Sequence, residues 1–124
     1  MKQLMSLYYG IKIKRLTKVK LHLGYAGYCL AKETHTIKGG NKINVKFNAL
    51  WALIHHPVNG YILFDTGYTK RFFEATKKYP NKLYANLTKV VLKKSEEVKE
   101  QLKKNNLDCN EIKHIVISHF HADH

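Results

Sequence analysis

The sequence has little of what would place it in several large classes of protein. Its two cysteines, Cys29 and Cys109, are too few for a disulfide framework, so both are expected to be reduced side chains in or near a core. No apolar run approaches the roughly 20 residues that cross a bilayer. The stretch MKQLMSLYYGIKIKR lacks a small-residue cleavage site, so a cytoplasmic protein without a secretory signal is expected.

Acidic residues and arginine are also scarce. Nine Asp and Glu stand against 22 Lys and Arg, which gives a formal net charge of +13, yet only Arg15 and Arg71 are arginines. Arginine is the residue that reads bases and phosphates with paired hydrogen bonds. The lysines are scattered from Lys2 to Lys113, so a solvated lysine-rich surface is favoured over a polyanion site. An acidic remainder of a longer chain would also restore the balance.

The remaining composition is that of an ordinary globular protein, and the first half of the chain predicts strands. The 124 residues, 44% hydrophobic and 25% charged, suit one domain. Alternation over 17–28 predicts a half-buried strand with His22 on its polar face. A second strand over 42–56 becomes continuously apolar, as strands do inside a core. The Asn59-Gly60 pair predicts a hairpin that returns through a strand over 61–65.

Helical spacing follows the hairpin. Residues 69–79 predict one helix, which Pro80 stops, and residues 83–91 predict a second. Ser95 is expected to cap a third helix, because Glu96 and Glu97 suit a helix N-terminus, and the Asn105-Asn106 pair ends it. Strands followed by helices and one more strand indicate an α+β fold, with helices on one face of a single sheet.

The last predicted strand leads into a cluster of metal-binding residue types. HIVIS, residues 114–118, is expected to be a buried strand that runs directly into HFHADH. Side chains two apart in an extended loop point the same way, so His119 and His121 could bind one ion, while Asp123 and His124 reach a neighbouring position. Imidazole and carboxylate suit Zn²⁺, Fe or Mn²⁺. The spacing favours two adjacent metals over a histidine-rich surface tail.

Two motifs together resemble a known family. SHFHADH, residues 118–124, is similar to the signature loop of the metallo-β-lactamase fold superfamily, and GYILFDTGY, residues 60–68, resembles its earlier strand ending in Asp-Thr-Gly. The resemblance spans residues 17–124. It implies that residues 1–124 are a single incomplete domain, the N-terminal half of an αββα sandwich. It also implies that one sheet face lacks its partner and exposes an apolar patch.

The resemblance further implies roles for individual residues. His119 and His121 would bind the first metal, and Asp123 and His124 the second, with Asp123 counted in the catalytic set. Asp65 would support the metal loop as a hydrogen-bond partner, the alternative being a simple strand-end turn.

Other residues near these motifs have lesser roles. Gly67 would let the backbone turn sharply under the site. Four other histidines are not expected to be ligands: His35, His55, His56 and His114.

The implied function is that of a metal-dependent hydrolase. Two divalent ions, Zn²⁺ before Fe or Mn²⁺, would activate a water against an ester or lactone of a small molecule. His121 favours hydrolysis, because the redox branch of the family has an acidic residue there, and HPVNGYILFDTG is most similar to lactonase-like members. The family draws further ligands from later in its chain. A missing C-terminal half or a partner chain is therefore expected to complete core and site, and these residues alone to be inactive.

Two alternatives remain open at this point. The net charge suits a nucleic-acid-processing metallo-hydrolase of the ribonuclease kind, whose binding should weaken steeply with salt. The shortage of ligands suits a non-catalytic remnant or an interaction module.

Overall fold

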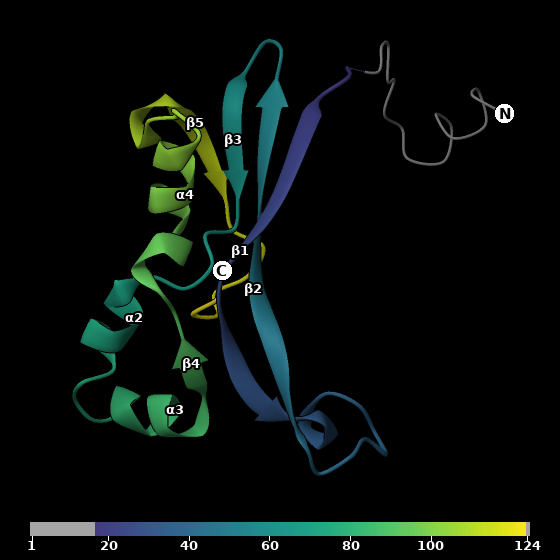
Figure 1. Ribbon diagram of the computed structural model, residues 1–124, viewed down its shortest axis with the longest axis vertical. Helices are drawn as coiled ribbons and strands as arrows, with labels where there is room; N and C mark the ends of the chain where they lie inside the picture. The colour runs from purple at the N-terminus through teal and green to yellow at the C-terminus, as the bar shows by residue number, and fades with distance from the viewer. Residues whose placement is uncertain (1–16, 124) are drawn as a thin grey trace, which may run out of the picture.

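The computed structural model describes residues 17–123, which form one twisted β-sheet with helices against one side of it (Figure 1). The sheet has five strands in the order β4-β1-β2-β3-β5. The strands are β1 (Lys20–Lys32), β2 (Asn44–His56), β3 (Gly60–Phe64), β4 (Lys89–Val91) and β5 (Ile112–Val116). The helices are α2 (Lys70–Ala75), α3 (Asn81–Leu87) and α4 (Val98–Lys104), with short 3₁₀ turns η1 (Glu33–His35), η2 (Lys94–Glu96) and η3 (Cys109–Glu111). The predicted α+β fold is confirmed.

The first three strands form an antiparallel meander, as the alternation and the turn residues predicted. Strand β1 pairs with β2 from Lys20↔His55 to Lys32↔Asn44, with an irregularity between Tyr25 and Tyr28. Strands β2 and β3 are joined by the predicted hairpin. Strand β5 instead pairs with β3 in parallel, which requires a long connection between them, and the three helices lie in that connection. The C-terminal ends of β3 and β5 therefore lie side by side at the same end of the sheet.

The core lies between the sheet and the helices. One buried cluster joins the sheet residues Trp51, Leu53 and Leu63 to Val98 and Leu102 of α4. Gly24 lies opposite Trp51 on β1, and a Cβ there would overlap the indole ring, so the glycine makes room for the largest core side chain.

A second, smaller cluster lies under the two short helices and consists of Ala49, Tyr68 and Phe72. The helix layer is also hydrogen-bonded to the sheet, because the Gln101 amide donates to the Tyr25 carbonyl oxygen at 2.8 Å. The two clusters together attach all three helices to the same face of the sheet.

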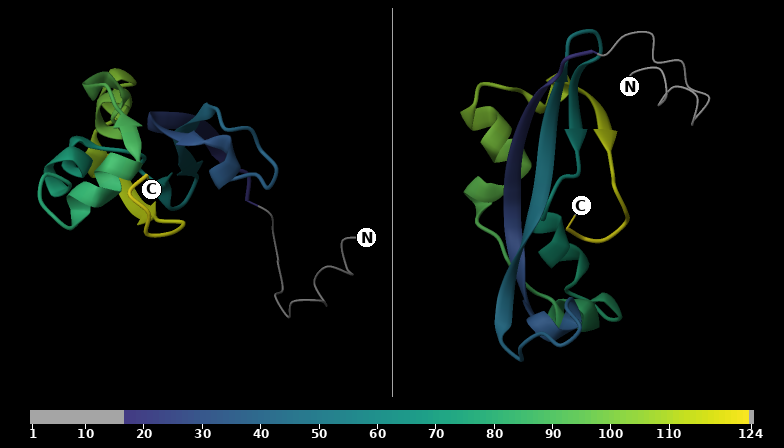
Figure 2. Two further views of the ribbon diagram at one scale, coloured as in Figure 1. Left: turned by 90° about the horizontal axis from the view of Figure 1, so that it is seen from below. Right: turned by 90° about the vertical axis from the view of Figure 1, so that its right-hand side faces the viewer.

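The opposite face of the sheet is apolar and exposed. In the right-hand view of Figure 2 the helices lie behind the sheet, so this face is turned to the viewer. Leu21, Leu23 and Tyr25 of β1 and Leu50 of β2 lie on it, and Leu23 is 76% exposed. The prediction that this apolar row of β1 is buried is therefore wrong for the part of the chain that the structure describes. An uncovered apolar sheet face is what the expected N-terminal half of an αββα sandwich implies.

Three local predictions are also wrong. The predicted helix over 83–91 ends at Leu87, because Val90 and Val91 pair with β1 as strand β4. The residue before α4 is Glu97 with extended backbone, and Ser95 lies in the preceding turn η2. The last strand is shifted toward the N-terminus of its predicted range, and Ile115 and Val116 are exposed because β5 is an edge strand.

The first predicted helix is also shorter than expected, since α2 ends at Ala75. No helix among residues 17–123 is long and apolar enough to cross a membrane.

Candidate metal centre

Asp65 joins the ends of the two parallel strands. It follows β3 directly, is buried, and has a left-handed backbone with φ of 57°, a region that Asp enters more readily than most residues. Its backbone amide donates to the Val116 carbonyl oxygen at 2.8 Å. Its Oδ1 atom accepts a hydrogen bond from the Ser118 amide at 2.7 Å. The carboxylate therefore holds the first residue of the predicted ligand loop where the strand β5 ends.

The turn after Asp65 packs closely against β1. Gly67 has φ of 63°, and a Cβ on it would lie 2.5 Å from the Cβ of Ala26. The next amide, of Tyr68, donates to the Ala26 carbonyl oxygen at 2.9 Å. A side chain at position 67 would push these backbones apart, so the Asp-Thr-Gly turn needs its glycine for both conformation and space.

The two histidines of the H-x-H pair converge. His119 Nε2 lies 3.0 Å from His121 Nδ1, and the two ring centroids are 4.5 Å apart at an interplanar angle of 75°. The Ser118 hydroxyl lies 2.9 Å from His119 Nδ1 and so orients the first ring from its other side. Phe120, between the histidines, is 99% exposed. The loop is a series of bends rather than extended backbone, yet the two rings meet on one side as predicted.

The spacing of these nitrogens suits one shared cation. In the structure the 3.0 Å contact is a hydrogen bond between the two rings, and two imidazole nitrogens bound to one tetrahedral Zn²⁺ at 2.0–2.1 Å would lie about 3.3 Å apart, so a small shift of the rings would bring both nitrogens to one ion. Both rings are solvent-exposed, and Asp123, two residues after His121 in the sequence, is half-buried. Among residues 17–123, no three metal-binding side chains converge as a group, and His124 lies outside the described residues. The four-ligand assignment therefore stays a prediction.

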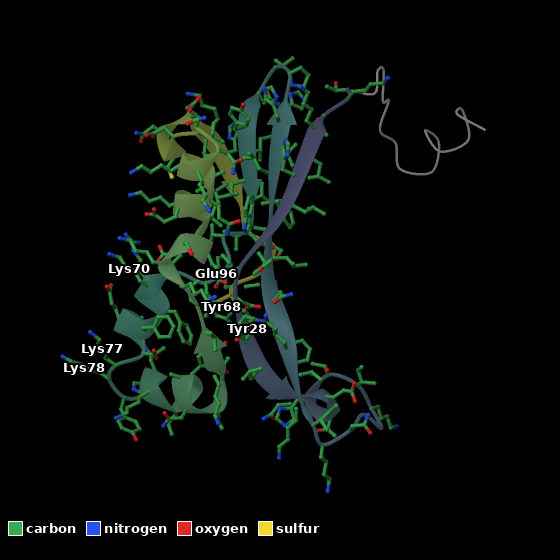
Figure 3. All side chains as sticks on the ribbon, viewed as in Figure 1. Tyr28, Tyr68, Lys70, Lys77, Lys78 and Glu96 are labelled. Carbon is green, nitrogen blue, oxygen red and sulfur yellow. The ribbon has the colours of Figure 1, made fainter. Side chains whose placement is uncertain are left out.

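Tyr68 is a residue near the site that sequence reasoning missed. It is almost fully buried between the helices and the sheet (Figure 3) and packs edge-on against Phe72 with ring centroids 5.4 Å apart. Burial raises the pKa of its hydroxyl well above the usual value, with further contributions from the hydrogen-bonded Cys29 thiol and the Asp123 carboxylate. A tyrosine directly after Asp-Thr-Gly was the available signal, but its burial depends on segments distant in sequence.

A pocket of about 400 Å³ adjoins the ligand loop. One wall is Ala122, which lies between His121 and Asp123 in sequence. The other lining residues come from α2, α3 and the residues flanking α2, and are Thr69, Arg71, Phe72, Ala75, Thr76, Asn81 and Tyr84. The aromatic and aliphatic side chains give the pocket a mainly apolar lining, which suits a hydrocarbon group more than a charged one.

The two hairpin histidines, His55 and His56, make local contacts. His56 Nδ1 accepts hydrogen bonds from the amides of Val58 and Asn59 at 3.2 and 3.0 Å. His55 stacks on Tyr61 with ring centroids 4.6 Å apart. Both therefore stabilise the β2–β3 turn.

The site is thus a loop with two adjacent imidazole rings at the end of β5, held by the buried Asp65 at the end of the parallel strand β3. Residues 46–124 match the Metallo-beta-lactamase superfamily, which is more than half of the chain. The chain belongs to this superfamily. No curated protein matches it closely enough to count as a relative.

Solved structures with the same fold include two lactone hydrolases. An N-acyl homoserine lactone hydrolase with N-hexanoyl-L-homoserine bound at its catalytic metal centre superposes with a TM-score of 0.70 at 18% identity, over 89% of this chain and 44% of that one. A quorum-quenching N-acyl homoserine lactone lactonase gives 0.65 at 19% identity, over 89% and 40%. The chain spans less than half the length of these structures.

Proposed function

We propose that this chain provides part of the active site of a metal-dependent hydrolase that opens small lactones or related esters bearing an apolar acyl chain. The observation that supports the metal is the 3.0 Å approach of His119 Nε2 to His121 Nδ1, on a loop held by Asp65. His119 and His121 would hold one divalent ion, and Asp123 and His124 a second, with Zn²⁺ before Fe or Mn²⁺. Such ions would lower the pKa of a water and polarise the substrate carbonyl.

The residues of the chain contribute orientation to this chemistry. Asp65 fixes the loop through the Ser118 amide, and the Ser118 hydroxyl positions the His119 ring from the side away from His121. Removing a group that orients a metal-binding histidine in this way usually lowers metal affinity by roughly 10–100-fold. Fewer than three ligands converge among residues 17–123, so we expect weak metal binding here and hydrolysis only with further ligands.

The acyl preference is proposed from the pocket beside the loop. Phe72, Ala75 and Tyr84 line it, and Ala122 connects it to the ligands on either side. A substrate whose carbonyl lies at the histidine pair could extend an apolar chain toward these side chains. The structural neighbour with N-hexanoyl-L-homoserine at its metal centre supports an acyl-substituted lactone as the substrate class.

Metal binding by the purified chain tests the first part of the proposal. Co²⁺ titrated into the wild type should give visible d–d absorption, and Zn²⁺ should displace it. His119→Ala and His121→Ala should each weaken Zn²⁺ binding at least about tenfold, while His114→Ala, an exposed histidine on β5, should not. Equal affinity in the wild type and the double variant H119A/H121A would contradict the assignment.

Hydrolysis tests the second part. N-hexanoyl homoserine lactone, a thioester and a phosphodiester should be assayed with metal-loaded chain, alone and within any longer polypeptide that contains it. Turnover of the lactone that disappears in H121A and persists in H114A is the expected result. Phosphodiester cleavage without lactone cleavage would instead favour nucleic-acid processing.

A further inference from the structure

The short helices α2 and α3 expose apolar side chains on the side away from the core. Leu83 is 54% exposed and Leu87 is 82% exposed, and they lie one turn apart on the same face of α3. Tyr79, just before this helix, is 67% exposed. We call these three residues, together with Lys77, Lys78 and Lys82, the hairpin surface.

The inner side of the same helix pair is packed, so the hairpin surface has a fixed orientation. The Tyr84 ring meets Phe72 edge-on, with centroids 6.1 Å apart, and Ala85 packs against the second core cluster. The Asn81 side-chain amide donates to the Ala75 carbonyl oxygen at 3.2 Å and ties α3 to α2. Leu83 and Leu87 therefore project from two helices whose relative position is fixed by packing and a hydrogen bond.

The segment that contains this surface is strongly cationic. Residues 66–95 contain eight Lys and Arg and a single acidic residue, Glu74. Lys77 and Lys78 extend outward from the end of α2, away from the sheet (Figure 3), and Lys82 Nζ lies 5.8 Å from the centre of the Tyr79 ring. The exposed leucines and tyrosine thus belong to a segment that carries eight cationic side chains and one acidic one.

We propose that the hairpin surface docks the protein onto an anionic lipid membrane. Leucine and tyrosine beside lysine is the composition of helices that lie in the membrane interface, where the apolar side chains enter the headgroup boundary and the lysines contact anionic lipid. A nucleic acid would use the lysines but would leave the two leucines in water. The charge complementarity and the exposed apolar face together select the membrane.

Docking through this surface would also place the acyl pocket at the membrane, because α2 and α3 line that pocket. This consequence rests on the proposed function. The docking itself does not, since it involves no metal ligand. An apolar acyl substrate concentrates in membranes, so a pocket held at the interface would meet more of it.

Vesicle co-sedimentation of the full chain without added metal tests the docking. Vesicles of phosphatidylcholine mixed with phosphatidylglycerol should bind the chain, vesicles of phosphatidylcholine alone should bind it much less, and added salt should weaken the binding. K77E/K78E should lower the affinity more than about tenfold, at about fivefold for each lysine lost. K103E/K104E changes the charge equally on exposed residues of α4 and should have a much smaller effect.

A leucine pair provides the second matched comparison. L83S/L87S should weaken binding to the anionic vesicles by at least about tenfold. L23S/L50S removes two exposed leucines from the uncovered sheet face and should leave binding near the wild-type level. Far-UV circular dichroism and thermal melting would verify that each variant is folded.

Several results would overturn the proposal. Equal losses in K77E/K78E and K103E/K104E would show that net charge alone attracts the vesicles. Loss in L23S/L50S without loss in L83S/L87S would move the contact to the sheet face. Tighter binding to a single-stranded RNA that is insensitive to L83S/L87S would assign the surface to nucleic acid. Loss of vesicle binding would leave the metal and turnover experiments unaffected, so the two proposals can fail separately.

Discussion

The Oδ1 atom of Asp65 accepts a hydrogen bond from the Ser118 backbone amide at 2.7 Å, across 53 residues of sequence. This contact connects the two motifs that the sequence presents separately, Asp-Thr-Gly and H-x-H-x-D-H. It sits where two parallel strands end together, so the backbone of the ligand loop starts from a fixed point. The start of the loop is therefore positioned by a buried carboxylate.

Asp65→Ala should destabilise the chain by about 1–3 kcal/mol, because the Ser118 amide loses a charged acceptor. Asp65→Asn keeps an acceptor oxygen and tolerates the left-handed backbone, so its cost should be smaller. Urea unfolding measures both costs. In a Zn²⁺ titration, D65A should likewise lose more metal affinity than D65N. Equal stability of D65A and wild type would mean that the contact does not constrain the loop.

Gly67→Ala should destabilise the fold by about 1–3 kcal/mol, through a strained backbone and an added clash with Ala26. Gly39→Ala is the matched control, because Gly39 also has a positive φ but has nothing within 4 Å of an added Cβ. The difference in stability between G67A and G39A measures the cost of the clash with Ala26 apart from the cost of the positive φ. If thermal melting shows equal losses, the close approach of the turn to β1 is not a constraint.

Tyr68 predicts how stability changes at high pH. Burial, Cys29 and Asp123 raise the pKa of its hydroxyl above the ordinary 10.0, so the folded chain keeps this proton when the unfolded chain has lost it. The free energy of unfolding should therefore fall as the pH rises above about 10. Tyr68→Phe should make that fall shallower and should cost about 0.5–1.5 kcal/mol at neutral pH for the hydrogen bond with Cys29.

Urea unfolding of the metal-free chain at neutral and alkaline pH measures this effect. Tyr79→Phe removes a hydroxyl from an exposed tyrosine and is the matched control against which the Y68F curve is compared. A pH dependence that is identical in Y68F and wild type would show that Tyr68 ionises alike in the folded and unfolded chains.

The strand meander was predictable because its signals are local. The Asn59-Gly60 pair specifies a tight turn between two apolar runs, and alternating residues specify the strands on either side. The spacing of His119 and His121 likewise predicted two rings on the same side of an extended loop. These features depend on neighbours in the sequence. The structure has the hairpin and the meeting of the two rings, although the ligand loop is bent rather than extended.

Other features were not predictable from the same signals. Val90 and Val91 continue a helical spacing, but short β-branched runs fit a strand equally well, and pairing with β1 decides the outcome. The apolar row of β1 was expected to be buried, yet the helices cover the other face of the sheet. The position of Tyr68 after Asp-Thr-Gly was the only local signal, and its burial was not predictable because its neighbours come from several segments distant in sequence.

The sequence alone determined which ligand types are present, their order along the loop, and the glycine and asparagine turns that direct the strands. Tertiary structure alone decided that Asp65 reaches Ser118, that Tyr68 lies buried near Asp123, and that Leu83 and Leu87 face outward. Turn geometry and side-chain alternation follow from covalent neighbours, whereas hydrogen bonds between distant strands and burial against helices depend on how far-apart segments pack.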